Sequence, residues 1–221
     1  MGQYRIAELN CEINTNSTTL GKNLERYETS FDCAPNLILS ISDDRLLQLM
    51  TENEGVTADR IECNALATLF SRELFDFNGF PIRSVAVENG EKAVLFSSPY
   101  ANNEMLQFIP PEKIFCVDFP AVRQIQNDFF VYDTPFGERG EYAKDKKLAM
   151  TSIVFVDSMH FDSLKKIDAS DYVPFFMKAV SQNIYDERTK HTLFVLEKLT
   201  HAVNFYGVSD LSDLDFILER V

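Results

Sequence analysis

Hydrophobic and polar positions alternate in the middle of the chain, and this pattern predicts strands there. The segments 82–87 and 92–96 flank Asn89-Gly90, a strong signal for a two-residue turn, so we predict a β-hairpin over 82–96. Short apolar runs predict further strands at 113–117, 129–132, 151–156 and 202–206. The pattern therefore indicates a sheet built from the middle and end of the chain.

Apolar residues recur every three or four positions in other segments, which predicts helices. We expect these helices at 45–50, at 58–75, from Ser170 through Val180, at 189–199, and from Ser209 or Ser212 to Val221. The helix over 58–75 puts Ile61, Ala65 and Leu69 on one face and ends before the turn signal Asn78-Gly79. Phe70, Phe75, Phe77 and Phe80 are spaced to pack between this helix and the hairpin.

The order of these elements predicts an α/β fold with a mostly antiparallel or mixed sheet flanked by helices. Residues 1–60 read as a small mixed extension, with imperfect alternation over 4–13 and an apolar run at 37–41. Residues 61–221 form the main predicted domain. The alternative is one continuous domain, since 221 residues is an ordinary size for it.

Composition narrows the classes of partner. The formal charge of -13 argues against nucleic acid, because affinity for a polyanion comes mainly from Lys and Arg. The longest nearly apolar stretch, 148–156, is far shorter than the roughly 20 residues of a membrane helix. The chain has no apolar N-terminal signal segment and no Cys-x-x-Cys pair, which favours a reducing, cytoplasmic location. No local metal motif links His160, His191 and His201.

The segment after the second hairpin strand is where a nucleotide-binding protein carries its phosphate loop. Such a loop points backbone N–H groups at the phosphates, with a lysine to balance charge and a Ser or Thr to hold Mg²⁺. The corresponding residues here are Ser97, Ser98, Pro99, Tyr100, Ala101, Asn102, Asn103, Glu104 and Met105. Because Glu104-Met105 replaces the Lys-Ser/Thr pair, we interpret this loop as vestigial.

Four segments carry a family resemblance through their order and spacing: the helix ending at Asn78-Gly79, the hairpin 82–96, the strand end 116–123 and the turn 131–137. Together they resemble the C-terminal domain of HPr kinase and its relatives, which share the nucleotide-binding fold of phosphoenolpyruvate carboxykinase. The resemblance covers about residues 60–221. It implies that fold, and it implies oligomers, with ATP and Mg²⁺ as cofactors of an active relative.

The departures from the family pattern argue against that chemistry. In the family a His occupies the position of Arg83, and an Asp-Asp pair occupies the position of Val117-Asp118, so one metal-binding carboxylate is missing here. Glu104 at about 4 Å from a phosphate charge would cost on the order of 4 kcal/mol at an effective dielectric near 20. Pro110-Pro111 also limits the helix after the loop to a turn or two.

These observations favour a noncatalytic protein that binds a protein or an anionic small molecule and needs no cofactor. The candidate ligand-binding residues are Arg83, Asp118 and Arg123, although Arg83 could instead pair with Glu104 or Asp118. The alternative is a phosphotransferase acting on a protein serine with ATP and Mg²⁺, in which Arg83 or Lys113 replaces the loop lysine. A purely structural subunit, in a homo-oligomer or with another protein, is the third hypothesis.

Overall fold

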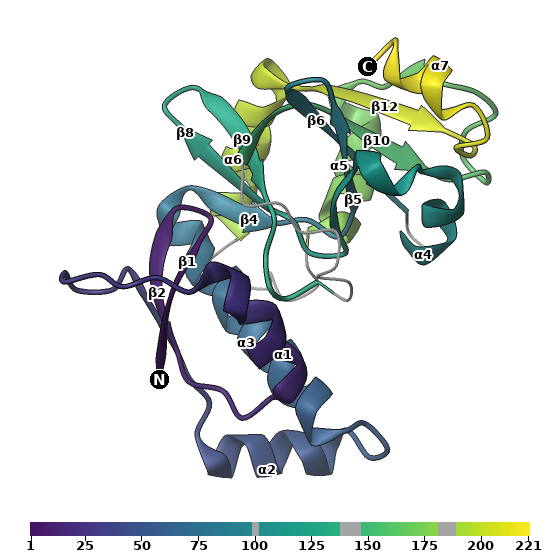
Figure 1. The fold of residues 1–221 in the computed structure, drawn as a ribbon. Coiled ribbons are helices and arrows are strands. Elements are labelled where there is room, and N and C mark those ends of the chain that lie inside the picture. Colours follow the sequence, from purple (N-terminus) through teal and green to yellow (C-terminus); the bar gives the residue numbers. More distant parts are fainter. Residues whose placement is uncertain (99–101, 138–146, 181–188) are drawn as a thin grey trace.

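Two sheets organise the chain, which is a mixed α/β protein in which the larger sheet is curled, of mixed strand direction and flanked by helices (Figure 1). The computed structural model describes residues 1–98, 102–137, 147–180 and 189–221. Within these residues one sheet has three strands, in the order β1-β2-β3, and the other has nine. The predicted fold class is correct at this level.

The small sheet belongs to the N-terminal part. It consists of β1 (Gly2–Ile6), β2 (Leu9–Ile13) and β3 (Leu37–Leu39), with β1 antiparallel and β3 parallel to β2. Ala7 and Glu8 form the turn between β1 and β2, and both have positive φ, as a type I′ turn requires. The weak alternation over 4–13 is thus a hairpin interrupted by its turn.

Side-chain caps begin the helices of this part. The helices are α1 (Thr18–Leu24), α2 (Asp43–Glu52) and α3 (Ala58–Leu74), followed by short 3₁₀ turns at Glu25–Tyr27 and Phe75–Phe77. Ser17, Ser42 and Thr57 each accept a hydrogen bond from an N–H in the first turn. The helices predicted at 45–50 and 58–75 are therefore confirmed, and Asn78, at φ 54°, ends the second of them.

The predicted buried face of α3 is correct at Ile61 but wrong at Ala65 and Leu69. Leu66, Phe70 and Leu74 are fully buried, whereas Ala65 and Leu69 are only half-buried. The helix contacts β3 of the small sheet and the strand Gly79–Pro81 of the large one, so two partners share its apolar surface. Of the four Phe residues predicted to pack between helix and hairpin, Phe75 and Phe80 are buried with hairpin residues, whereas Phe70 is buried and Phe77 half-buried in the cluster of the small sheet.

The large sheet has the order β4-β8-β9-β10-β6-β5-β7, and β12 pairs with both β10 and β11. Its strands are β4 (Gly79–Pro81), β5 (Val85–Asn89), β6 (Lys92–Ser97), β7 (Ile114–Val117), β8 (Ala121–Ile125), β9 (Asp128–Tyr132), β10 (Lys147–Val156), β11 (Lys165–Lys166) and β12 (Asn204–Val208). The predicted hairpin is β5 and β6, and its turn residues are Gly90 and Glu91, one position later than predicted. Strand β8 was missed.

Helices cover both faces of this sheet. On one face lie α5 (Ala169–Ala179) and α6 (Thr189–Ala202), which bury Phe176 and Leu199. On the other lie α4 (Asn102–Met105), short 3₁₀ turns at Leu106–Phe108 and Pro111–Lys113, and α7 (Leu214–Leu218). Helix α5 begins after Asp168 rather than at Ser170, and α7 begins after Asp213, not after Ser209 or Ser212.

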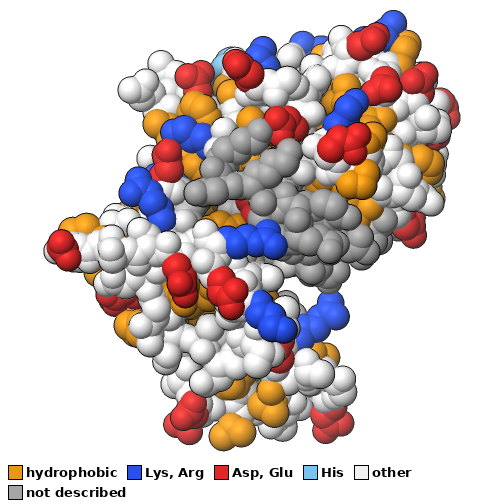
Figure 2. Space-filling model, viewed as in Figure 1, with side chains coloured by type: hydrophobic (Ala, Val, Ile, Leu, Met, Phe, Trp, Pro, Cys, Tyr) orange, Lys and Arg blue, Asp and Glu red, His pale blue; other side chains and the backbone are white. Residues whose placement is uncertain are grey.

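Acidic and basic side chains are mixed on the face of the molecule that Figure 2 shows. On the face in Figure 2, Asp and Glu side chains are scattered among Lys and Arg rather than gathered in one patch.

None of the helices in the described part of the chain has the length and apolarity required to span a membrane.

Arg123 connects the N-terminal part to the large sheet. From β8, its Nη1 donates to the carbonyl of Ala7 at 2.5 Å and its Nε donates to the carbonyl of Phe77 at 3.3 Å. One guanidinium therefore holds the β1–β2 turn and the end of α3 together, using the fixed fork of donors that Arg provides.

We predict that Arg123→Met lowers the free energy of unfolding by about 1.5–3 kcal/mol, because Met keeps the apolar stem and removes charge-assisted hydrogen bonds. Urea unfolding monitored by circular dichroism measures the change. Arg45→Met is the matched control, since Arg45 bonds only an exposed neighbour, Gln48, and should cost less than about 0.5 kcal/mol. Equal effects of the two substitutions would contradict this role for Arg123.

Candidate functional site

Strand direction brings several predicted site residues to one edge of the large sheet. Strands β6, β10 and β12 are parallel, and β7 runs the same way because both β6 and β7 are antiparallel to β5. Their carboxyl ends therefore meet at one edge, where α/β proteins commonly bind ligands. Ser97, Asp118, Asp157 and Ser209 lie at or just after these ends, and Arg83 lies just before β5.

Hydrogen bonds fix the backbone at this edge. The Ser97 hydroxyl donates to the carbonyl of Arg83 at 2.9 Å, and the Asp118 N–H donates to the carbonyl of Ser84 at 2.9 Å. The N–H of Arg83 donates to the carbonyl of Ala179, at the end of α5, at 2.8 Å. The structure thus brings Arg83, Ser97 and Asp118 to one edge.

The turn 133–137 closes against the end of β7. Asp118 has a positive φ of 69°, and the next residue, Phe119, accepts a hydrogen bond from the Thr134 hydroxyl at 2.6 Å. A Cβ on Gly137 would lie 2.4 Å from the carbonyl oxygen of Val117, so this close approach requires glycine. Two segments singled out in the sequence for their order and spacing are therefore in direct contact.

A cavity of about 290 Å³ opens beside Arg83. Its lining comes from the ends of β6, β10 and α5: Arg83, Ser97, Ser98, Phe155, Phe175, Lys178 and Ala179. Among the described lining residues the charged ones, Arg83 and Lys178, are both cations, and both side chains are exposed. The described part of the lining is therefore positively charged, on a chain whose net charge is -13.

A second cavity, of about 160 Å³, lies on the other side of Ser98, which lines both. Its charged residues are Glu104, Asp157 and Asp210, so its charge is opposite to that of the first cavity. Asp157 is buried and accepts hydrogen bonds from the Met159 N–H at 2.9 Å and from Nδ1 of His160 at 2.8 Å. Sequence reasoning missed this pair, although the Asp-x-x-His spacing after a strand was visible.

Described residues of the segment predicted to be a vestigial phosphate loop line both cavities: Ser97 and Ser98 the first, Ser98, Glu104 and Met105 the second. Ser97 ends β6 and Ser98 follows, while Pro99, Tyr100 and Ala101 lie outside the described residues. Asn102, Asn103, Glu104 and Met105 form the four-residue helix α4, consistent with the predicted short helix. A helix of this length has a weak dipole. Met105 is buried among apolar side chains, so it contributes packing there.

Other candidates lie away from this edge. Arg123 binds the carbonyls of Ala7 and Phe77, and Lys113 lies at the opposite end of β7 from Asp118, with Nζ 2.8 Å from Asp215. A lysine at that end of the strand cannot replace the charge of the loop lysine. Within the described residues, no three His, Cys, Asp or Glu side chains are close enough together to form a metal-binding group.

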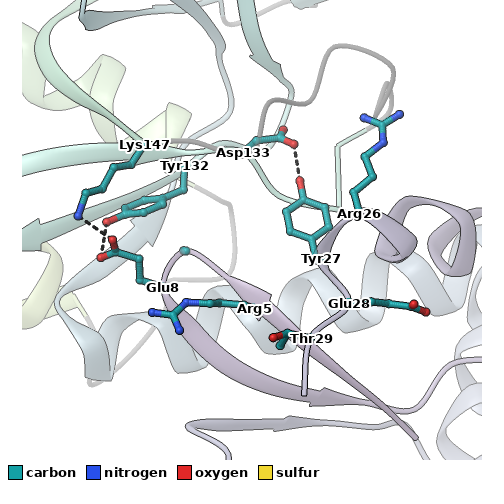
Figure 3. Close-up of a pocket in the computed structure, with 10 residues that line it drawn as sticks. Arg5, Glu8, Arg26, Tyr27, Glu28, Thr29, Tyr132, Asp133 and Lys147 are labelled. Carbon is teal, nitrogen blue, oxygen red and sulfur yellow. Dashed lines mark hydrogen bonds and ion pairs between the residues drawn. The ribbon is translucent and has the colours of Figure 1, made fainter. Parts of the chain in front are cut away.

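The largest of the described cavities, about 410 Å³, lies at the junction of the two parts of the chain. Its polar groups pair with one another (Figure 3): Lys147 Nζ lies 2.6 Å from Glu8, the Tyr132 hydroxyl donates to Glu8 at 3.0 Å, and Tyr27 donates to Asp133. Arg5 and Arg26 lie apart and point in different directions. We interpret this cavity as a polar junction rather than a convergent ligand site.

Burial controls protonation at this junction. Asp133 is 8% exposed, and burial raises its pKa against the opposing effect of hydrogen bonds from Cys116 and Tyr27. Burial and the neighbouring Asp133 charge raise the pKa of the Tyr27 phenol, so Tyr27 stays a donor. A raised carboxyl pKa means that the folded state binds a proton more tightly than the unfolded state.

Comparison with known proteins gives no family: no family model matches the chain, and no curated protein matches it. The resemblance to HPr kinase therefore stays a prediction from the sequence.

We predict that Tyr27→Phe lowers stability more at about pH 8 than at about pH 4, near the ordinary carboxyl pKa, because it removes a donor that stabilises the Asp133 carboxylate. The expected loss at the higher pH is about 1–3 kcal/mol. With its pKa raised, Asp133 favours folding at low pH and loses this contribution as the pH rises. Urea unfolding at both pH values measures the difference.

The control for this prediction is the same substitution in an Asp133→Asn background. Asn keeps an acceptor for Tyr27 and removes the titrating charge, so the effect of Tyr27→Phe should become independent of pH. An equal loss at both pH values in the chain that retains Asp133 would contradict the assignment.

Proposed function

We propose that this chain is a noncatalytic relative of HPr kinase, with a phosphoenolpyruvate carboxykinase-like fold, and that it binds an anionic group at the carboxyl edge of its large sheet. The observation that carries the proposal is the cavity in which Arg83 and Lys178 present the charge beside Ser97 and Ser98. The anion belongs to a small molecule or to a side chain of a partner protein.

Contacts in the structure support the proposed relation to HPr kinase. They join segments whose order and spacing along the chain carried the resemblance. Ser97 bonds the carbonyl of Arg83, Asp118 bonds that of Ser84, and the turn 133–137 packs on the end of β7. In an active relative these segments would surround the nucleotide phosphates. Their meeting at one edge is what the resemblance requires.

The side chains at the positions that would bind phosphate and Mg²⁺ argue against phosphoryl transfer. Catalysis of this kind depends on compensating phosphate charge and on oxygen ligands for Mg²⁺. Glu104 puts a carboxylate where the lysine should be, and Met105 and Val117 offer no side-chain oxygen. The phosphotransferase alternative keeps only Arg83 as a substitute cation, because Lys113 is at the other end of β7.

The charge arrangement favours an anion on the Arg83 side of Ser98. Arg83 and Lys178 line one cavity, where they would attract an anion. The carboxylates of Glu104, Asp157 and Asp210 line the neighbouring cavity. Arg can bind a carboxylate or phosphate through two parallel hydrogen bonds, and Lys adds a point charge. The site therefore selects anions through side chains, without the backbone cradle of a phosphate loop.

We predict that inorganic phosphate raises the melting temperature of the protein in a manner that saturates and does not need Mg²⁺. A ligand at 100 times its Kd stabilises the folded state by about 2.7 kcal/mol. Arg83→Gln should weaken binding about tenfold or more, since a charge-assisted hydrogen bond contributes about 1.5–3 kcal/mol. Thermal unfolding across a phosphate series, at constant ionic strength, measures both effects.

Lys92→Gln is the matched control, because Lys92 is an exposed cation at the opposite end of β6. It should leave phosphate binding unchanged. A Mg²⁺-dependent shift with ATP, together with phosphoryl transfer, would overturn the noncatalytic proposal in favour of the kinase alternative. No shift with phosphate, or equal weakening by both substitutions, would overturn the anion site.

The family proposal has a separate test. Glu104→Lys with Met105→Ser restores the residue types of the phosphate loop, so we predict measurable binding of Mg²⁺-ATP by this double variant and none by the parent chain. Isothermal titration calorimetry provides the measurement. A folded double variant, verified by circular dichroism, that still fails to bind would contradict the alignment of 97–105 with a phosphate loop.

A further inference from the structure

The cavity beside Arg83 is lined by two aromatic rings, which form its aromatic wall, as well as by the two cations. Phe155, on β10, and Phe175, on α5, both line it together with Arg83 and Lys178. Their ring centroids are 5.4 Å apart and the ring planes are inclined at 32°. A ligand in the cavity would therefore lie among two cationic side chains and two aromatic rings.

Neighbouring rings hold the orientation of Phe175. Phe161 packs against it with centroids 5.3 Å apart, and the His160 ring meets it at 87° with the same centroid separation. His160 is itself held by Asp157 through the 2.8 Å hydrogen bond. The aromatic wall is thus supported by contacts outside the cavity, and such preorganisation reduces the ordering cost of binding.

Cavity size limits the ligand. About 290 Å³ is at the small end of the range for small-molecule sites, so it accommodates one ring with one charged group rather than a nucleotide. The two cations alone bind weakly, because both are exposed to solvent and a small hydrated anion keeps much of its water there. Additional affinity has to come from apolar contact with the rings.

We propose that the anion recognised at this cavity carries an aromatic group, as in an aryl phosphate or an aromatic carboxylate. The charged end binds Arg83 and Lys178, and the ring packs against Phe155 and Phe175. This inference depends on the anion site proposed above and specifies its ligand class.

Phenyl phosphate, methyl phosphate, inorganic phosphate and benzyl alcohol are the probes, titrated into the full chain by isothermal titration calorimetry. Phenyl phosphate should bind at least about tenfold more tightly than methyl phosphate or inorganic phosphate, because only it engages the aromatic wall. Benzyl alcohol lacks the charge and should bind at least about tenfold more weakly than phenyl phosphate.

Two substitutions distinguish the contribution of the cationic side chains to binding from that of the aromatic rings. Phe175→Leu should weaken phenyl phosphate about tenfold and change inorganic phosphate less than about twofold, whereas Arg83→Gln should weaken both phosphates. Phe216→Leu, at an exposed Phe on α7, is the control for ring removal and should change neither. If Phe175→Leu does not fold, the comparison of the probes on the parent chain still decides the question.

The outcomes are distinct. Equal affinities for phenyl, methyl and inorganic phosphate, all sensitive to Arg83→Gln, would overturn the aromatic ligand class and leave the anion site standing. No binding by any phosphate would overturn both. Equal binding of benzyl alcohol and phenyl phosphate would show an apolar pocket without anion recognition and would also overturn both.

Discussion

The pairing of β10 is the constraint on which the rest of the structure depends. This strand is antiparallel to β9 at its start and parallel to β12 over its second half, while β6 follows its other side. A register shift between Met150 and Ser152 allows one strand to serve all three partners. The curl of the sheet and the alignment of the strand ends that form the candidate site both follow from it.

A second contact region determines how the N-terminal part meets this sheet. Arg123 binds the β1–β2 turn, and the same turn supplies Glu8 to Lys147 at the start of β10. In the same region Asp133 is buried beside Tyr27, and it is the first residue of the turn 133–137 that packs on the end of β7. The junction and the sheet edge are therefore joined through five residues, 133–137. A charge buried at the junction thus lies one residue from a contact that shapes the sheet edge.

Local sequence signals correctly predicted those helices and strands that form mainly through interactions between residues close together in the chain. The β5–β6 hairpin has its turn signal between two apolar runs, and α2 and α3 have capping residues before periodic segments. Strand β8 was missed because Ala121–Ile125 pairs with β4 and β9 without an apolar run of its own, and Arg123 interrupts its pattern. The buried face of α3 was predicted only in part because two packing partners, not periodicity alone, determine it. Arg83, Ser97 and Asp118 were candidates from the sequence, but Lys178, Phe155 and Phe175 come from distant segments and share a cavity with Arg83 and Ser97 only in the folded chain.

The two cavities that share Ser98 differ in the charge of their described lining residues. A phosphate loop depends on backbone N–H groups, a lysine and the N-terminus of a long helix. Here the helix has four residues and a glutamate replaces the lysine, so the loop side has become acidic. Positive charge lies instead on Arg83 and Lys178, contributed by the segment before β5 and by the end of α5. In the proposed site these two side chains and the rings of Phe155 and Phe175 line one small cavity, which would suit a compact organic anion better than a triphosphate held along its length. The proposal thus separates anion binding from the groups that phosphoryl transfer requires.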